Sequence, residues 1–429
     1  MKMKRALFKF KPFSVKQKKI LTWWLEESGV SEKDGIIADG AIRSGKTVSM
    51  SLSFVMWAME SFSSQNFAMC GKTISSFRRN VWFWLKIMLF SRGYRILEHR
   101  NENMVEIHRA EKVNYFYIFG GKDESSQDLI QGITLAGVFF DEVALMPQSF
   151  VDQATGRCSI EGSKFWFNCN PRGPYHWFKL EWVDRAKDKN ILYLHFTMDD
   201  NLSLSEKIKE RYRSMYTGVF FRRCILGLWV LAEGLIYDMF DEEKHKVKTQ
   251  ERSYSKYYVS MDYGTQNPTT FNLWGEYQGK WFKVKEYYYS GRSSGIQKTD
   301  EEYANEYERW IGSVKPAAII VDPSAASFIA TMRKRGYKII PARNEVLDGI
   351  RVVSSLLYQG ILLYNDCCKE TFKEFSSYSW DPKAAERGED KPIKESDHCL
   401  DGDRYFVYTI LRNLVNKKER INHSGKGAR

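Results

Sequence analysis

Eight consecutive residues near the start of the chain have the pattern of a nucleotide-binding loop. The run Gly40-Ala41-Ile42-Arg43-Ser44-Gly45-Lys46-Thr47 fits G-x-x-x-x-G-K-[ST] at every fixed position. In such a loop the backbone around Gly40, Ser44 and Gly45 surrounds the phosphates, Lys46 reaches the outer phosphates, and the Thr47 hydroxyl binds Mg²⁺. An apolar run from 36 to 39 precedes the loop, and a helical pattern from 47 to 59 follows it. The sequence therefore predicts an ATP site with Mg²⁺ between a strand and a helix.

A second motif, Phe139-Phe140-Asp141-Glu142, has the composition expected of the partner of such a loop. The apolar strand before it would deliver Asp141 to the Mg²⁺ shell, and Glu142 would orient and deprotonate the attacking water. Alone, the motif could equally be a strand that ends in a solvated acidic turn. The phosphate loop upstream favours the catalytic interpretation.

Three further polar residues each have two interpretations. Arg43, inside the loop, could contact the γ-phosphate as an arginine finger or bind an acidic neighbour. Gln17 precedes the loop at the separation expected of a glutamine that reads adenine, or it belongs to an ordinary helix surface. Asn170, before Pro171, could sense the γ-phosphate or form a simple turn.

Three acidic residues in the second half have contexts that suit a metal-dependent nuclease. Asp262 ends an alternating strand, Asp322 ends an apolar strand, and Asp401 lies in a helix. If the two strands are adjacent, their carboxylates meet, and carboxylates are ligands that Mg²⁺ and Mn²⁺ prefer. Two such ions about 4 Å apart can activate water and stabilise the leaving oxygen of a phosphodiester.

The helix that carries Asp401 also presents a histidine. Asp397, His398 and Asp401 share one face, whereas Asp403 points elsewhere. His398 could assist metal binding or proton transfer, or it could be structural. Taken singly, each aspartate could be a strand-end or helix-cap residue, but their strand, strand, helix order favours a ribonuclease-H-like site.

Composition agrees with a nucleic-acid enzyme of more than one domain. The 429 residues carry a net charge of +12, which favours a polyanionic partner. None of the seven cysteines forms a C-x-x-C pair, which indicates a reducing cytosol and argues against zinc. The N-terminus has no signal-peptide pattern, and no apolar run reaches the ~18 residues of a membrane span.

The elements that must position these residues form two α/β domains. Strands alternating with helices predict a mainly parallel sheet in the first half. A polar helix is expected from 203 to about 226, and a last helix from 397 to 415 with Ser396 as N-cap. The predicted organisation is an ATPase domain over 1–240 with a lid at about 200–235, a linker over 241–255, and a nuclease domain over 256–429 with a basic C-terminal tail.

Together these motifs resemble the large subunit of tailed-phage terminases over nearly the whole chain. The resemblance rests on the two ATPase motifs and on a series of later ones: 130–134 (IQGIT), 170–177 (NPRGPYHW), 227–234 (GLWVLAEG), 261–264 (MDYG), 321–322 (VD) and 397–405 (DHCLDGDRY). It implies an additional-strand P-loop ATPase domain joined to a ribonuclease-H/integrase-like nuclease domain. One departure is Gly402, where the family pattern usually has alanine.

The resemblance also implies a biological setting. The expected activity is ATP-driven movement of double-stranded viral DNA into a prohead through the portal, with endonuclease cutting of concatemeric DNA. The expected partners are DNA, the portal, a small terminase subunit and copies of the chain in a pentameric ring, all in the host cytoplasm. Arg109 and Arg157 are candidates for an arginine finger supplied to a neighbouring subunit. A cellular helicase–nuclease of DNA repair and a DNA-binding adaptor with inactive sites are the alternatives.

Overall fold

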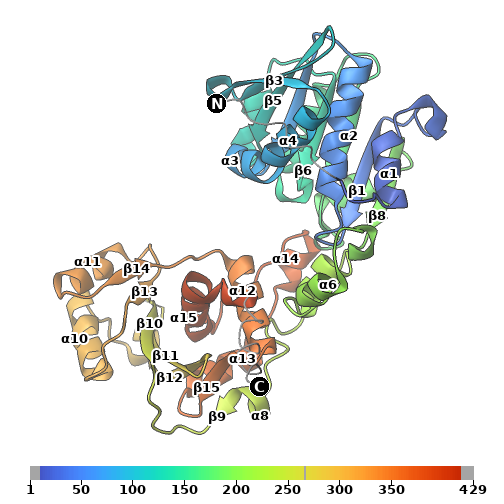
Figure 1. Cartoon of the computed structure of the whole chain (residues 1–429). Coiled ribbons are helices and arrows are strands. Elements are labelled where there is room, and N and C mark those ends of the chain that lie inside the picture. The colour runs from blue at the N-terminus through green and yellow to red at the C-terminus, as the bar shows by residue number, and fades with distance from the viewer. Residues whose placement is uncertain (1–9, 265–266, 417–429) are drawn as a thin grey trace, which may run out of the picture. The chain divides into compact units, whose positions relative to one another are not determined.

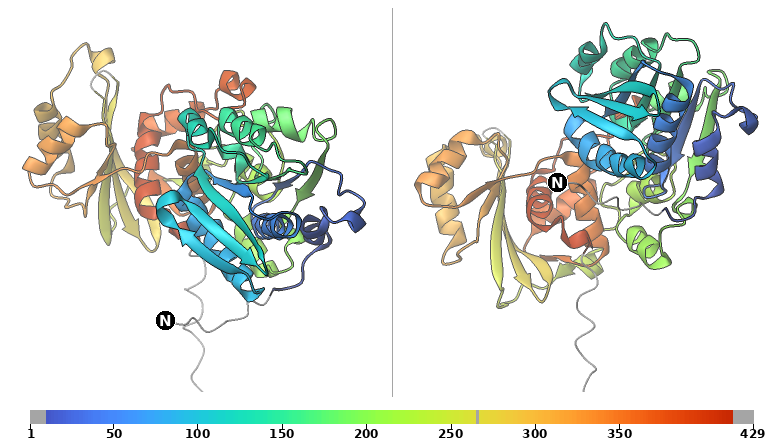
Figure 2. Two further views of the ribbon diagram at one scale, coloured as in Figure 1. Left: turned by 90° about the horizontal axis from the view of Figure 1, so that it is seen from above. Right: turned by 45° about the horizontal axis from the view of Figure 1, so that its top comes forward.

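The structure is a computed structural model that describes residues 10–264 and 267–416 (Figures 1 and 2). It contains two compact units. The first comprises the chain up to Glu210 with 221–231 and 386–389, and the second comprises 211–220, 232–385 and the chain from 390 onward. The predicted basic tail, 417–429, lies outside the described residues.

The first unit is built on an eight-stranded sheet in the order β3-β4-β5-β2-β6-β7-β1-β8. The pairs from β5 to β8 are parallel, and β4 is antiparallel to both of its neighbours, β3 and β5. Strand β7 lies between β1, which leads into the phosphate loop, and β6, which ends in Asp141; this is the additional strand that the resemblance implies. The strands are β1 (Gly35–Gly40), β2 (Asn66–Gly71), β3 (Arg95–His99), β4 (Met104–Arg109), β5 (Lys112–Gly120), β6 (Gly137–Asp141), β7 (Lys164–Asn168) and β8 (Ile191–Phe196).

Helices pack on this sheet through apolar and aromatic side chains, with α2 lying along it in Figure 1. Phe54 of α2 is fully buried, and its ring lies 5.3–6.1 Å from those of Phe67, Phe116 and Trp166 on three different strands. Such aromatic packing fixes the direction of α2, and with it the loop at its N-terminus. The helices of this unit are α1 (Val15–Thr22), α2 (Lys46–Ser61), α3 (Ile74–Phe77), α4 (Phe83–Ser91) and α5 (Gln148–Gly156).

The single helix predicted from 203 to 226 is wrong. The structure has α6 (Glu206–Arg213), a short α7 (Gly218–Phe220) and a π turn (Phe221–Ile225) in its place. α6 ends at Arg213, and Gly218, the first residue of α7, has φ +54°, a left-handed conformation that a continuous helix does not contain and that glycine adopts without strain.

The second unit contains a seven-stranded sheet in the order β14-β13-β10-β11-β12-β15-β9. β10, β11 and β12 form an antiparallel meander, and β13 pairs with β10 in parallel. This arrangement brings the ends of β10 and β13 together, as the nuclease prediction requires. The strands are β9 (Lys246–Val247), β10 (Lys256–Asp262), β11 (Thr269–Tyr277), β12 (Lys280–Tyr289), β13 (Ile319–Val321), β14 (Ile339–Pro341) and β15 (Leu362–Asn365).

Residues 241–255 belong to the second unit and are not a free linker. They contain α8 (Glu242–His245) and β9, and β9 pairs in parallel with β15. The buried ring of His245 hydrogen-bonds the Leu357 carbonyl at 3.0 Å, and just before α8 the Phe240 ring stacks on Phe375 at 3.9 Å. The unit therefore begins well before residue 256.

Helices cover the second sheet, and α15 (His398–Phe406) packs on β10 and β11. The N-cap of α15 is Asp397 and not the predicted Ser396, which has φ +51°. Beyond Phe406 the chain continues as a π turn (Val407–Leu411), so the predicted helix to 415 is not regular. The remaining helices are α9 (Gly291–Ser294), α10 (Asp300–Ile311), α11 (Ala326–Lys334), α12 (Val346–Tyr358), α13 (Lys369–Ser377) and α14 (Pro382–Glu386).

Candidate active sites

The phosphate loop lies between β1 and α2 as predicted. Gly40 and Gly45 have φ +120° and +85°, which a side chain would strain. A Cβ on Gly40 would also lie 2.0 Å from the Phe196 carbonyl oxygen. Within residues 10–264, the backbone N–H groups of 44–47 donate to no backbone carbonyl. A helix N-terminus with four such N–H groups is suited to binding phosphates.

The Lys46 ammonium lies inside the loop. It donates to the Gly40 and Ala41 carbonyls at 3.1 and 2.7 Å and to the Ser44 hydroxyl at 3.1 Å. Burial lowers the pKa of Lys46 to about 8, although Asp141 and other acidic groups oppose this shift. An anion beside the ammonium would restore its charged form, so Lys46 fits a phosphate ligand.

The predicted magnesium ligands Thr47 and Asp141 meet directly. The Thr47 hydroxyl donates to Asp141 Oδ1 at 3.1 Å, and Asn168 Nδ2 donates to both, at 2.8 Å to Thr47 and 2.6 Å to Asp141. Burial and the neighbouring Glu142 raise the pKa of Asp141 to about 7. This set of oxygen donors fits Mg²⁺, which would favour the ionised form of the carboxyl.

Asn168 is a site residue that sequence reasoning missed. The sequence analysis selected Asn170, two residues later, as the polar residue expected to end the strand that follows the Asp141 strand. Asn168 ends β7, the strand between β1 and β6, and is therefore adjacent to both magnesium ligands. An asparagine ending a buried strand could have been noticed, but only the strand order shows that this strand lies between the other two.

The other predicted residues of the nucleotide site also gather at the loop. Asn170 Oδ1 accepts from the Lys46 ammonium at 3.2 Å, and Gln17 Nε2 donates to the Ser44 carbonyl at 3.5 Å. Gln17 also forms a capping box with Ser14 at the start of α1, so part of its amide is already engaged. Glu142 is exposed in the left-handed conformation, with φ +59°. Arg43, with φ +57°, is likewise exposed.

The candidates for a finger supplied to a neighbour lie elsewhere on the first unit. Arg109 ends β4, donates to the Tyr94 hydroxyl at 3.0 Å and is about half exposed. Arg157 is the C-cap of α5. The positions of Arg109 and Arg157 in a single chain do not test whether either one reaches the ATP site of a neighbouring subunit.

A segment that the sequence analysis did not assign to the ATP site contacts the phosphate loop. The Ile42 N–H donates to the Cys224 carbonyl at 2.8 Å, and the Trp229 indole N–H donates to Asp39 Oδ2 at 2.6 Å. Asp39 is fully buried at the end of β1, and the His195 ring contacts its other oxygen at 3.0 Å. At Gly227, a Cβ would lie 2.7 Å from a loop nitrogen. Residues 224–229 are therefore packed against residues 39–42, at the start of the phosphate loop.

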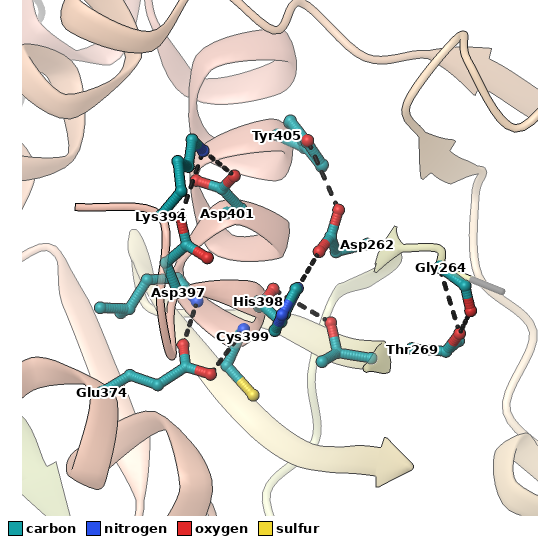
Figure 3. A network of polar contacts seen from close by, with 12 residues as sticks. Asp262, Gly264, Thr269, Glu374, Lys394, Asp397, His398, Cys399, Asp401 and Tyr405 are labelled. Carbon is teal, nitrogen blue, oxygen red and sulfur yellow. Dashed lines mark hydrogen bonds and ion pairs between the residues drawn. The ribbon is translucent and has the colours of Figure 1, made fainter. Parts of the chain in front are cut away.

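In the second unit, Asp262 and His398 form a close pair, as Figure 3 shows. His398 Nδ1 lies 2.8 Å from Asp262 Oδ2, and the Tyr405 hydroxyl lies 3.5 Å from Asp262 Oδ1. Burial raises the pKa of Asp262; the hydrogen bond with His398 opposes this shift, and Asp401 adds to it. Burial lowers the pKa of His398, but the Asp262 carboxylate outweighs it and the net shift is upward. The Asp262 carboxylate therefore favours the protonated form of the His398 imidazole, whereas burial opposes ionisation of Asp262 itself.

Asp322 follows β13 and lies next to the same tyrosine. It accepts from the Ser324 N–H at 2.8 Å and from Asn344 Nδ2 at 3.2 Å. Burial would raise the pKa of Asp322, but these bonds and one from Tyr405 lower it overall. Asp262 and Asp322 are therefore two carboxylates from adjacent strands around one hydroxyl group.

Asp401 is held by cations. Arg404 Nη2 lies 2.9 Å from Asp401 Oδ1. Lys394 Nζ lies 2.9 Å from Asp401 Oδ2, as Figure 3 shows. Among the described residues, no three acidic, histidine or cysteine side chains form a ready metal-binding group. Asp262 and Asp322 fit a divalent cation by donor type, and Asp401 fits one only if a cationic side chain moves.

Asp403 faces away from the other carboxylates, as predicted. It is fully buried, and its Oδ1 lies 2.9 Å from the equally buried Lys283 ammonium. Glu286 Oε2 lies 3.6 Å from the same ammonium, and the Thr371 hydroxyl accepts from it at 2.5 Å. Burial would lower the pKa of Lys283, but the interaction with Asp403 and Glu286 outweighs it and raises that pKa, so the lysine stays charged. Asp403 is a structural residue that joins α15 to β12.

The glycine at 402 also has a structural explanation. A Cβ there would lie 2.2 Å from Asn272 Nδ2 on β11. Asn272 is fully buried, and the same nitrogen donates to the Cys399 carbonyl at 3.4 Å. Alanine, the usual residue of the family pattern, would collide with Asn272, so glycine here lets α15 approach β11 closely.

A further residue outside the predicted set holds the start of α15. The Glu374 carboxylate accepts from the N–H groups of Cys399 and Leu400 at 3.1 and 2.9 Å. Burial raises the pKa of Glu374 to about 7, although these two bonds oppose the shift. Because Glu374 lies on α13, it caps α15 from a different helix.

Comparisons with known proteins agree with this architecture. Residues 37–244 match the family model described as the N-terminal part of the T4likevirus-type terminase large subunit. A solved large terminase from a thermophilic bacteriophage is 65% identical, covers 94% of this chain and 100% of its own, and has a TM-score of 0.89. The same thermophilic-phage protein was also solved with ATP-gamma-S, at 64% identity over 93% of this chain and 100% of its own, with a TM-score of 0.85.

A curated relative, the terminase large subunit of Escherichia phage T5, is 26% identical over 291 residues. That match spans 64% of this chain and 65% of the relative, just under two thirds of its length. Within the described residues, no helix is long and apolar enough to cross a membrane. The α/β architecture of an ATPase unit with a nuclease unit is confirmed, and the chain belongs to the family of bacteriophage terminase large subunits.

Proposed function

We propose that this chain hydrolyses ATP to move double-stranded viral DNA into a prohead and cuts that DNA with a metal-dependent nuclease. The observation that carries the proposal is the presence of both sites on one chain that matches a large terminase over that protein's full length. The net charge of +12 supports a DNA partner. By family membership, we propose the portal and a small terminase subunit as partners, a pentameric ring on the portal, and action in the host cytoplasm.

In the proposed ATP reaction, the loop N–H groups and Lys46 hold the phosphates. Thr47 and Asp141 would hold Mg²⁺, which would neutralise phosphate charge when bound. Asn168 keeps the two ligands in place, and Glu142 orients the attacking water and accepts its proton. The thermophilic-phage terminase solved with ATP-gamma-S supports nucleotide binding at such a site.

Four other residues complete the proposed nucleotide site. Arg43 neutralises charge that develops on the γ-phosphate, and Gln17 reads the adenine. Asn170, which contacts Lys46, senses whether the γ-phosphate is present. Arg109 is our preferred candidate for a finger to a neighbouring subunit, because it lies half exposed at the end of a strand.

In the proposed nuclease reaction, Asp262, Asp322 and Asp401 would hold one or two Mg²⁺ or Mn²⁺ ions. These ions supply an activated water and charge stabilisation at the phosphodiester when bound. His398, paired with Asp262, moves a proton or assists the metal. The Tyr405 hydroxyl contacts both Asp262 and Asp322 and holds the two carboxylates close together.

ATP turnover tests the first site. Lys46→Ala should abolish hydrolysis, because the phosphate ligand is lost. Glu142→Gln should still bind a fluorescent ATP analogue but turn over at least about a hundredfold more slowly, because general base catalysis contributes that much. The exposed Glu161→Gln serves as the matched control. Near-normal turnover by Glu142→Gln would exclude it as the base.

Plasmid cleavage tests the second site. Asp262→Asn, Asp322→Asn and Asp401→Asn should each remove cutting in Mg²⁺ and in Mn²⁺ while ATP turnover remains. Asparagine keeps the shape of each residue, so loss of folding is a smaller concern than with alanine. Cutting that persists in Asp262→Asn or Asp322→Asn would contradict the proposed metal site.

A further inference from the structure

The Lys394 ammonium lies beside Asp401, at a place where the proposed nuclease would bind a metal ion. This ammonium lies 2.9 Å from Asp401 Oδ2 and 3.2 Å from Asp397 Oδ2, so it bridges two carboxylates from one helix face. Figure 3 shows these three side chains grouped on one side of α15, with Asp262 and His398 beside them. A single cation between two carboxylates is the arrangement that a divalent ion would replace.

The carboxylates around Lys394 depend on it. Asp397 is buried, and within the described residues its Oδ2 has no hydrogen-bond donor of good geometry, so the ion pair with Lys394 offsets its burial. Asp401 is buried as well, with a side-chain exposure of 9%. A buried carboxylate without a cation is costly, which explains why a lysine lies between these two.

The two cations that hold Asp401 differ in their freedom to move. Arg404 is 2% exposed and also donates to the Asn344 carbonyl at 3.0 Å, so it is fixed in the interior. Lys394 is 55% exposed and precedes α15 in a segment without regular structure. A long, flexible, half-exposed side chain can move into solvent at small cost once another cation neutralises the two carboxylates. Lys394 is therefore the displaceable cation.

We propose that Lys394 acts as an internal counter-cation that occupies Asp401 and Asp397 and must be displaced before a divalent ion binds there. The inference rests on the proposed nuclease function. Its consequence is that Lys394 weakens metal binding at Asp401 and raises the metal concentration needed for cutting. Asp262 and Asp322, which have no ion pair with a lysine in the described structure, keep their metal affinity independent of it. Lys394 thus sets the metal concentration that the nuclease needs for cutting, without itself contacting the reacting atoms.

Metal binding by the full chain tests the proposal directly. Mn²⁺ is titrated by calorimetry into the wild type, Lys394→Met and Lys394→Arg, without nucleotide or DNA. Asp401→Asn measures the Mn²⁺ that binds elsewhere, including at Thr47 and Asp141. Lys394→Met should bind Mn²⁺ at least roughly threefold more tightly, the change that one half-exposed ion pair allows. Lys394→Arg should bind no more tightly than the wild type.

The matched control is Lys280→Met, which removes an exposed lysine of the same unit and should leave Mn²⁺ affinity unchanged. The Mn²⁺ concentration for half-maximal plasmid cutting should also fall in Lys394→Met, and the thermal transition shows that each variant is folded. Suppose that folded Lys394→Met binds Mn²⁺ no more tightly than the wild type, while Asp401→Asn still loses binding. This result overturns the role proposed for Lys394 and leaves the metal site in place. Mn²⁺ binding that is the same in Asp401→Asn and Asp262→Asn as in the wild type overturns the metal site and the inference with it.

Discussion

The buried ion pair between Lys283 and Asp403 leads to a quantitative prediction about stability. Both side chains are fully buried, at 0% and 1% exposure, and their charged atoms are 2.9 Å apart. Asp403→Ala would leave the ammonium of Lys283 in the interior, where Glu286, at 3.6 Å, is its remaining ion-pair partner among the described residues. Breaking a buried pair by removing one partner typically costs about 3–5 kcal/mol. Because Glu286 remains, we expect the lower end, about 3 kcal/mol.

Differential scanning calorimetry of the full chain measures this loss. For a unit of this size, each kcal/mol shifts Tm by roughly 2–4 °C, so the second unit should melt about 6–12 °C lower. The transition that Mg²⁺-ADP does not raise belongs to the second unit, since a ligand stabilises the unit that binds it. Cutting measured well below that transition should persist, because Asp403 does not face Asp262 or Asp401.

A double variant distinguishes the charge effect from simple loss of packing. Lys283→Met with Asp403→Leu replaces the pair by apolar side chains of similar size, which is often neutral or stabilising. We therefore expect it to recover most of the stability that Asp403→Ala loses. A loss below about 1 kcal/mol in Asp403→Ala, or a double variant as unstable as the single one, would refute the reasoning.

Three further predictions concern other parts of the chain. Gly402→Ala should destabilise the second unit by about 1–3 kcal/mol by overpacking against Asn272, and adding Asn272→Ala should relieve it; equal stability of Gly402→Ala and the wild type in urea unfolding would contradict the collision. Exposed Cys367 has a pKa lowered to about 6 by a bond from the next thiol, so its thiolate fraction and its alkylation by iodoacetamide should be high at pH 7 and fall below pH 6. Mass spectrometry should find it modified before the buried cysteines, and a rate that keeps rising about tenfold per pH unit up to pH 8, as for an ordinary thiol, would disprove the shift. Trp229→Phe leaves buried Asp39 without its indole donor and should lower ATP turnover or affinity severalfold, whereas an unchanged kcat and KM would show that residues 224–229 only cover the loop.

The sequence alone determined those features that lie within short continuous stretches. The phosphate loop is eight adjacent residues whose neighbours form a strand and a helix, so both its position and its chemistry follow from local pattern. Asp141 and Glu142 end an apolar strand for the same reason, and most strand positions could be predicted from runs of buried apolar residues. The strand ends at Asp262 and Asp322 were also local features, and the family resemblance implied that they belong to one nuclease site.

The tertiary structure decided which separate segments meet, and therefore what each site residue contacts. Asn168 joins the magnesium ligands because β7 lies between β1 and β6, and strand order is not encoded in any one strand. Residues 241–255 read as a charged linker, but β9 adds to a sheet edge that forms only when β15 is in place. Lys394 and Asp401 were both visible in the sequence, yet their pairing depends on how the segment before α15 folds back on that helix. Pairing between charges separated in sequence is set by packing and burial, which local periodicity cannot report.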